Sequence, residues 1–371
     1  MYECFGLPSH AFGRYRCGIS YYSSLLKTCH HPDLLKKEVA KQLLLSFAQK
    51  QKRPCLLIPT TDWYVDLALQ LQSELSPCFM MATPNPEHFY EFSKKERFYR
   101  VLDTYGIAHP QTTVFTVGEW VDCDRFPVIV KPSCSYEVEK CHFQGQKKVY
   151  LIESADDFRK TIAMLTTHHK GFTYLLQPYL KPQQSFVLTV FSQKEFGACS
   201  AVLAEVVLEE VGDTSRGNYC ALKVRPLDAS AQKLVDFCGK IGYDGIVNFD
   251  IIRTEDGDFV LDMNMRVGRS VDHIRGAGHK VADFLLKSQN RYTRYQGSFS
   301  SVPVYWRTVR DREVLNLCPP HLKSEIRESI RNGFATSPYE SVTRKPKPLE
   351  WLYQTIHQGR ATRATALAYR R

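Results

Sequence analysis

The chain has 371 residues, 43% of them hydrophobic and 24% charged, which leaves room for two or three domains of about 150 residues each. No stretch reaches the roughly 18 apolar residues that span a bilayer, and no basic-then-apolar signal segment opens the chain. We therefore expect neither a transmembrane segment nor secretion. The 12 cysteines are scattered without a CxxC pair, which is typical of reduced thiols in a cytoplasmic protein and argues against a zinc site.

The positive charge is concentrated near the C-terminus. Residues 303–371 contain 13 basic and 6 acidic residues, an excess of 7 (13 − 6) out of the total of +10 (49 − 39). A basic segment is typical of a solvated surface, and also of contact with nucleic acid, an anionic membrane or an acidic ligand. Because its aromatic residues are not spaced as a platform for stacked bases, we expect no nucleic-acid partner, while peripheral membrane contact stays open.

The first 88 residues alternate between predicted strands and helices. Residues 9–12 predict a strand, residues 33–48 carry apolar side chains at helical spacing, and residues 54–59 form an apolar run typical of a buried parallel strand. Thr61 predicts the start of a helix that continues to about residue 75. Residues 1–6 resemble the end of a helix closed by glycine. We therefore expect an α/β domain that lacks its first strand.

A second unit begins near residue 89. The sequence Ser93-Lys94-Lys95-Glu96 predicts a capping box, with Ser93 as N-cap and Glu96 reaching back, before a helix that stops at Gly106. A polar loop is predicted over residues 133–146. Further strands are predicted at 112–117, 125–132, 149–152 and 174–177, with a helix at 155–165. Lys131 ends an apolar strand, where a lysine can meet a phosphate, although strand-terminal lysines are common.

The second half of the chain is richer in strands, predicted at 185–191, 198–209 and 220–224, and Asp228 caps a predicted helix. A hairpin then spans residues 245–264. Its predicted turn is a three-residue loop ending in Gly257, which pairs Thr254 with Asp258 and places Asp250 opposite Asp262.

The hairpin brings together oxygen ligands inside otherwise apolar strands. Asn264 lies two residues beyond Asp262 and therefore on the same face. Directly opposed carboxylates repel each other, and a divalent cation removes the conflict. Oxygen-only ligands suit magnesium, which takes one or two carboxylates together with substrate phosphates. The alternative is a half-exposed hairpin whose register is off by one residue, and spacing alone does not decide between the two.

These motifs occur in the order found in the ATP-grasp ligases, and the resemblance spans roughly residues 7–286. The segments that carry it are Lys95, 128–132, 176–180, Asp250 and 261–266. The pattern resembles the carboxylate–amine ligase branch that includes D-aspartate ligase. Residues 131–137, residues 142–145 and the long segment after Asn264 support that branch.

The resemblance implies a fold of α/β plus α+β class, in which an ATP-grasp domain follows a pre-ATP-grasp α/β domain that we expect to be N-terminally truncated. The implied units are the partial pre-ATP-grasp domain at 1–88, the ATP-grasp domain at 89–300 and a basic C-terminal segment at 301–371. The small lobe covers about 89–180 and the large lobe about 181–300. ATP is expected between these lobes.

The resemblance also implies roles for individual residues. Those implied to contact ATP are Lys95, Lys131, Gln177, Pro178, Tyr179, Leu180, Gln184 and Lys223. Those implied to hold one or two Mg²⁺ are Asp250, Asp262 and Asn264. Arg266 is implied to face the transferring phosphoryl group, Arg269 to help bind the carboxylate substrate, and Arg216 is a weaker candidate. The chain departs from the family at Pro178 and Gln184, where acids are usual.

The implied reaction joins an amino-acid carboxylate to an amine through an acyl phosphate. The sharpest expectation is D-aspartate ligation to an amine of a peptidoglycan precursor, with Tyr305-Trp306-Arg307 and residues 344–347 assisting capture of the anionic acceptor. Another amino-acid or dipeptide ligase is the first alternative. A degenerate, non-catalytic ATP-binding protein is the second. The expected location is cytoplasmic, and the sequence does not indicate an oligomeric state.

Overall fold

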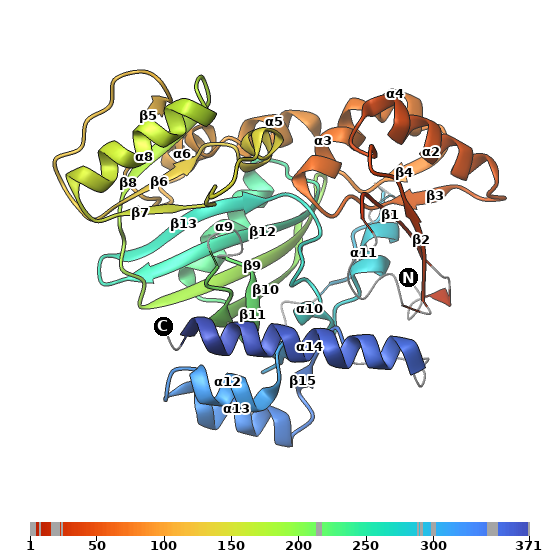
Figure 1. Ribbon diagram of the computed structural model, residues 1–371. Coiled ribbons are helices and arrows are strands. Elements are labelled where there is room, and N and C mark those ends of the chain that lie inside the picture. The colour runs from red at the N-terminus through yellow and green to blue at the C-terminus, as the bar shows by residue number, and fades with distance from the viewer. Residues whose placement is uncertain are drawn as a thin grey trace.

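The molecule has three parts, an N-terminal part, a small lobe and a large sheet (Figure 1). The structure is a computed structural model that describes residues 5–6, 9–15, 23, 25–212, 217–287, 289, 292–297, 302–339 and 348–369, with only the backbone described for 349–351. The predicted helix end at residues 1–6 and the candidates Arg216 and 344–347 lie wholly or largely outside these residues. Within the described chain, no helix is both long and apolar enough to cross a membrane.

The N-terminal part contains two small parallel sheets. Strand β1 (Ser9–Gly13) pairs with β2 (Leu26–His30), and β3 (Cys55–Leu57) pairs with β4 (Phe79–Met81). Strand β2 was not predicted, because its five residues alternate without a strong apolar pattern. The helices are α2 (Lys37–Gln49), α3 (Asp62–Gln70) and α4 (Gln72–Leu75). The predicted Thr61 cap is confirmed, since its side chain accepts a hydrogen bond from the Tyr64 amide.

The small lobe is a four-stranded antiparallel sheet in the order β5-β8-β6-β7. Its strands are β5 (Thr113–Thr116), β6 (Val128–Pro132), β7 (Tyr150–Ile152) and β8 (Thr173–Pro178). Its helices are α5 (Pro86–Phe92), α6 (Lys95–Thr104) and α8 (Ala155–His168). All four strands and both predicted helices of this lobe occur where the sequence predicts them.

Two local predictions in the small lobe are wrong. Lys94, not Ser93, is the N-cap of α6, and no side chain caps it, because Ser93 ends the preceding helix α5. The Glu96 side chain instead accepts a hydrogen bond from the Ser133 hydroxyl. The predicted loop over 133–146 contains the short helix α7 (Ser135–Val138) and the 3-10 turn η2 (Glu139–Cys141).

The large sheet has seven strands in the order β13-β12-β9-β10-β11-β14-β15. They are β9 (Gln184–Gln193), β10 (Gly197–Glu209), β11 (Tyr219–Arg225), β12 (Gly245–Thr254), β13 (Gly257–Asn264), β14 (Tyr305–Arg307) and β15 (Ala335–Thr336). Helix α9 (Ala229–Lys240), capped by Asp228 as predicted, packs against Phe186 and Leu188 on one face. Helices α10 (His273–Gly276) and α11 (Val281–Lys287) pack against Val187 on the other.

The C-terminal segment is built into the large sheet. Strands β14 and β15 extend it, and α12 (Asp311–Leu317), α13 (Leu322–Arg331) and α14 (Pro348–Tyr369) lie beside it, with α14 below β11 in this view (Figure 1). Tyr305 and Trp306 are fully buried, and Arg307 pairs with Asp311 at 2.7 Å. The prediction that residues 305–307 capture an acceptor is therefore wrong, because these side chains support the core.

Candidate active site

In the hairpin of β12 and β13, the predicted pairing of Asp250 with Asp262 is present, but the turn differs from the predicted one. The turn is a two-residue loop that pairs Thr254 with Gly257, so the predicted three-residue loop is wrong. A β-bulge then inserts Leu261 as an extra residue on β13. The bulge restores the predicted opposition of Asp250 and Asp262, which is confirmed. The turn is one residue shorter than predicted and the bulge adds one residue, so the two differences cancel. Both carboxylates therefore share one face of the sheet.

Both carboxylates are half-buried, but Asp250 is hydrogen-bonded by neutral groups whereas Asp262 pairs with a cation. Asp250 accepts hydrogen bonds from the Tyr219 hydroxyl at 2.5 Å and the Asn264 amide at 3.1 Å. Burial and the nearby Asp262 carboxylate raise the pKa of Asp250 above its ordinary value. Burial would also raise the pKa of Asp262, but the ammonium groups of Lys95, at 3.1 Å, and Lys131 hold that pKa below its ordinary value.

The donor set fits magnesium. Among the described residues, no group of three or more His, Cys, Asp and Glu side chains is placed to hold a metal. The candidates are the carboxylates of Asp250 and Asp262 and the amide oxygen of Asn264, which suit a hard cation whose remaining ligands are water and phosphate. Burial, and then the opposed Asp262 carboxylate, raise the pKa of Asp250, and a bound divalent cation would offset that repulsion.

Two lysines of the small lobe reach this carboxylate pair. Burial alone would lower the pKa of Lys95, but the Asp262 carboxylate, together with smaller contributions such as that of Tyr99, raises it to about 12. Lys131 is buried beside Lys95, and burial and then that like charge lower its pKa to about 7. The Lys131 ammonium donates to the Tyr99 hydroxyl at 3.3 Å, which in turn donates to the backbone carbonyl of Leu261 at 2.9 Å. A phosphate between the lobes would add to the counter-charge that Asp262 and Asp250 give Lys131.

Arg266 faces the N-terminal part of the molecule. Its guanidinium makes a bidentate pair with Asp62 at 3.0 and 3.2 Å, and it also donates to the Asn264 side chain at 3.3 Å. The more exposed Arg269 pairs with Glu210 at 2.8 Å. Asp62 belongs to the first turn of α3, so the N-terminal part contributes directly to the site. The sequence carried no signal for this contact, because the two partners are 204 residues apart.

The end of β8 is the predicted adenine contact. Gln177 is buried and donates from its side chain to Thr112 at 2.8 Å. Pro178 and Tyr179 are exposed, Leu180 is half-buried, and the Tyr179 amide donates to the Pro127 carbonyl at 3.0 Å. A contact to adenine at this strand end stays a proposal.

Two predicted ATP contacts lie on the wrong face of the large sheet. Asp250 pairs with Val187 of β9, so Gln184, three residues earlier, points to the opposite face, where it donates to Glu205 at 3.1 Å. Lys223 is directly opposite Glu205 on β11 and shares that face. It is buried under α13, and its ammonium donates to the Pro303 carbonyl at 2.7 Å and the Ser329 hydroxyl at 2.6 Å. Neither residue lines the carboxylate site.

Several residues of the site were missed by the sequence reasoning. Ser185, one residue after Gln184, shares the face of Asp250. Lys148 lies near enough to act on both carboxylates, and its ammonium is one of the smaller causes that lower the pKa of Asp250 and of Asp262. The others are Tyr99, Tyr219 and Asp62. Alternate residues of β9 share a face, so Ser185 could be identified once the pairing of Val187 with Asp250 is known.

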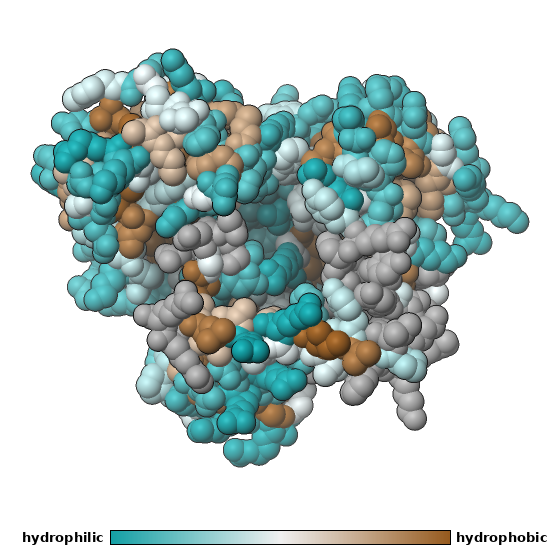
Figure 2. Space-filling model, viewed as in Figure 1, coloured by the Kyte–Doolittle hydropathy of each residue, from teal (hydrophilic) through white to brown (hydrophobic). Residues whose placement is uncertain are grey.

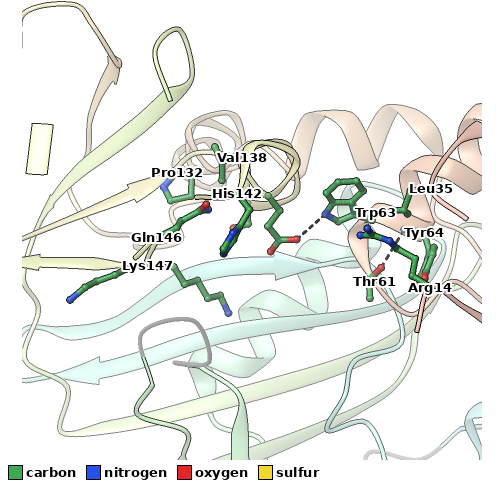
Figure 3. A pocket seen from close by; sticks show the side chains of 13 residues that line it. Arg14, Leu35, Thr61, Trp63, Tyr64, Pro132, Val138, His142, Gln146 and Lys147 are labelled. Carbon is green, nitrogen blue, oxygen red and sulfur yellow. Dashed lines mark hydrogen bonds between the residues drawn. The ribbon is translucent and has the colours of Figure 1, made fainter. Parts of the chain in front are cut away.

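A cavity of about 440 Å³ adjoins this site, between α3 and the segment that follows β6. Figure 2 shows the molecule hollowed between the small lobe and the N-terminal part, with hydrophilic side chains in the hollow. In Figure 3, Pro132 and His142 face the cavity from the small lobe, and Trp63 and Arg14 face it from the N-terminal part.

Comparisons with known proteins agree with this geometry. No family profile matches the chain. A D-aspartate ligase of Enterococcus faecium (strain Aus0004) is 24% identical over 302 residues, covering 77% of this chain and 72% of the relative. The biotin carboxylase domain of Hydrogenobacter thermophilus 2-oxoglutarate carboxylase, crystallised with MgADP and bicarbonate, has a TM-score of 0.59 at 13% identity and covers 82% of this chain and 69% of its own. The chain has the ATP-grasp fold.

The ATP-grasp fold predicted from the sequence is thereby confirmed. A further ATP-grasp neighbour, the L-amino acid ligase from Bacillus licheniformis, has a TM-score of 0.54 at 12% identity and covers 79% of this chain and 70% of its own. At such identities the structural likeness establishes the fold, and the substrates of this ATP-grasp chain must be argued from its own residues.

Proposed function

We propose that this ATP-grasp chain is an ATP-dependent carboxylate–amine ligase that forms an amide through an acyl phosphate. The observation that carries the proposal is the convergence of Lys95 and Lys131 from one lobe on Asp262 and Asp250 of the other. Such a cluster of cations and carboxylates at a lobe interface suits a Mg²⁺-bound polyphosphate.

Each group has a role in this proposal. Lys95 and Lys131 bind phosphate oxygens as point charges, because both ammonium groups are buried at the lobe interface. Asp250, Asp262 and Asn264 hold magnesium, which when bound neutralises the β- and γ-phosphates. Residues 177–180 contact adenine through their backbone. Arg266 is held by Asp62 toward the reacting groups, and Arg269 contributes to carboxylate binding.

The proposed reaction has two balanced steps. A substrate carboxylate oxygen attacks the γ-phosphorus of ATP, the bond from that phosphorus to the bridging oxygen breaks, and ADP leaves with the electron pair. The amine nitrogen then attacks the acyl carbon, the carbon–oxygen bond to phosphate breaks, and the nitrogen loses a proton. The protein supplies position and positive charge rather than a nucleophile, so Lys131 and Arg266 act by stabilising negative charge as it develops.

For the substrates, we propose D-aspartate as the carboxylate and an amine of a peptidoglycan precursor as the acceptor. The D-aspartate ligase of E. faecium supports this choice at 24% identity. Another amino acid or a dipeptide is the alternative, supported by the likeness to an L-amino acid ligase. We propose a cytoplasmic location, where ATP is available.

The decisive experiment measures ADP release with Mg²⁺ and ATP over a panel of D- and L-amino acids, each with and without candidate amines. The proposal predicts amine-dependent ADP release with one or a few amino acids, D-aspartate first among them. Asp262→Asn is expected to lower the rate at least about 100-fold. The matched control is Asp256→Asn, the same exchange in the exposed turn of the same hairpin, which is expected to retain full activity.

A second candidate function, ATP binding without catalysis, is favoured by Pro178 at the adenine strand, where the family usually carries an acid. This candidate predicts MgATP binding by titration calorimetry with no ADP release for any amino acid. Release that depends on an amino acid but survives in Asp262→Asn would instead contradict the assignment of the site.

A further inference from the structure

The cavity between α3 and the segment after β6 carries an excess of positive charge. Its charged walls are Arg14, Lys147, Lys148 and one acid, Glu139, which leaves a net charge of +2 (3 − 1) among the described lining residues, with His142 beside them. The single carboxylate is engaged by the opposite wall, because the Trp63 indole donates to Glu139 at 2.8 Å. A concave wall with one dominant sign of charge concentrates oppositely charged ligands.

The cavity adjoins the carboxylate site at two points. Lys148 lines it and also acts on the Asp250 and Asp262 carboxylates. Asp62, which binds Arg266, lies in the chain between two lining residues, the N-cap Thr61 and Trp63 of α3. A molecule in the cavity therefore has one end beside the place proposed for the reacting phosphoryl group.

The remaining walls are largely apolar and aromatic. Trp63, Tyr64, Pro132 and Val138 line the cavity together with its cations (Figure 3). Its volume of about 440 Å³ lies within the usual range for pockets that take a small organic ligand rather than a lone ion.

We infer that this cavity receives the amine substrate, and that this substrate carries an anionic group, a phosphate or a carboxylate, besides its reacting amine. The inference rests on the proposed function, which requires an amine near the acyl phosphate. Arg14 recognises the distal anion, because its guanidinium belongs to the N-terminal part, across the cavity from Pro132 (Figure 3). The basic groups that meet the acceptor are thus those of the cavity, and not residues 305–307.

The test compares two probes that differ by one phosphate, ethanolamine and phosphoethanolamine. Their binding to the full-length protein with MgADP is measured by titration calorimetry at fixed ionic strength. We expect phosphoethanolamine to bind at least about tenfold more tightly than ethanolamine. Arg14→Gln is expected to weaken phosphoethanolamine by about tenfold while leaving MgADP unchanged. Arg53→Gln, a surface arginine of the same N-terminal part, is the matched control and is expected to change neither.

Three results would overturn the inference: equal affinity for the two probes, no measurable binding of either, or an Arg14→Gln variant that loses MgADP affinity as well. N-acetyl-lysine and its amide repeat the comparison with a carboxylate in place of phosphate, and so distinguish the two anions. Selective amine binding without any turnover would contradict the ligase proposal alone. Turnover confined to uncharged amines would contradict the cavity assignment alone.

Discussion

Tyr99 connects the lobes of the site through its hydroxyl group, so Tyr99→Phe is the most informative substitution in this chain. The ring is buried and stacks on His109 with ring centroids 4.5 Å apart, and phenylalanine preserves that packing. The hydroxyl donates to Leu261, the residue that the β-bulge leaves unpaired, and accepts from the Lys131 ammonium. Its loss leaves a backbone carbonyl and a buried cation each without this partner.

The size of the effect follows from these two hydrogen bonds. A neutral hydrogen bond contributes about 0.5–1.5 kcal/mol, and one to a charged group about 1.5–3 kcal/mol. We therefore expect Tyr99→Phe to lower the free energy of unfolding by about 2–4 kcal/mol. Because Lys131 and the strand that carries Asp262 both lose an anchor, we also expect a higher KM for MgATP.

The assay is urea unfolding followed by far-UV circular dichroism, together with steady-state ADP release. Tyr105→Phe is the matched control, since Tyr105 closes the same helix and its ring is partly exposed. The control is expected to change the free energy of unfolding by less than about 0.5 kcal/mol. An equally small change for Tyr99→Phe, or an unchanged KM for MgATP, would refute the role given to this hydroxyl.

Three further predictions concern other parts of the molecule. Burial lowers the pKa of His273 to about 4 from 6.5, so the unfolded chain binds more protons between these values and the histidine's contribution is fully present above pH 6.5. The free energy of unfolding should therefore fall by about 3 kcal/mol as the pH drops from 6.5 toward 4. The His273→Asn variant, whose amide can still donate to the Ser270 carbonyl, should not show this part of the pH dependence when its urea midpoints are measured over the same range. Asp62→Asn should lower kcat for ADP release about tenfold with little change in the KM for MgATP, because Arg266 loses its charged partner; an unchanged kcat would contradict that role. Trp306→Ala should lower the free energy of unfolding by about 3–5 kcal/mol in urea titrations, whereas a surface capture role predicts almost no change.

Local patterns of the sequence predicted much of this fold. Thr61 and Asp228 cap their helices as predicted, because a helix start is decided by groups within four residues. The predicted cap at Ser93 was wrong because Ser93 is the C-cap of helix α5. That helix was not predicted from the sequence. The opposition of Asp250 and Asp262 was predicted correctly although the turn was not, since the bulge compensated for the shorter loop.

The sequence by itself determined most strands and helices between residues 93 and 264, the resemblance to the ATP-grasp motifs and the carboxylate pair, because periodicity, caps and turns act over a few neighbouring residues. Only the tertiary structure decided which face each strand residue occupies. In the observed register Ser185 shares the face of Asp250, whereas a shift by one residue would place Gln184 there. It also decided that Lys223 lies under α13 and that Asp62 meets Arg266. These contacts join segments more than 100 residues apart, whose meeting depends on the path of the whole chain.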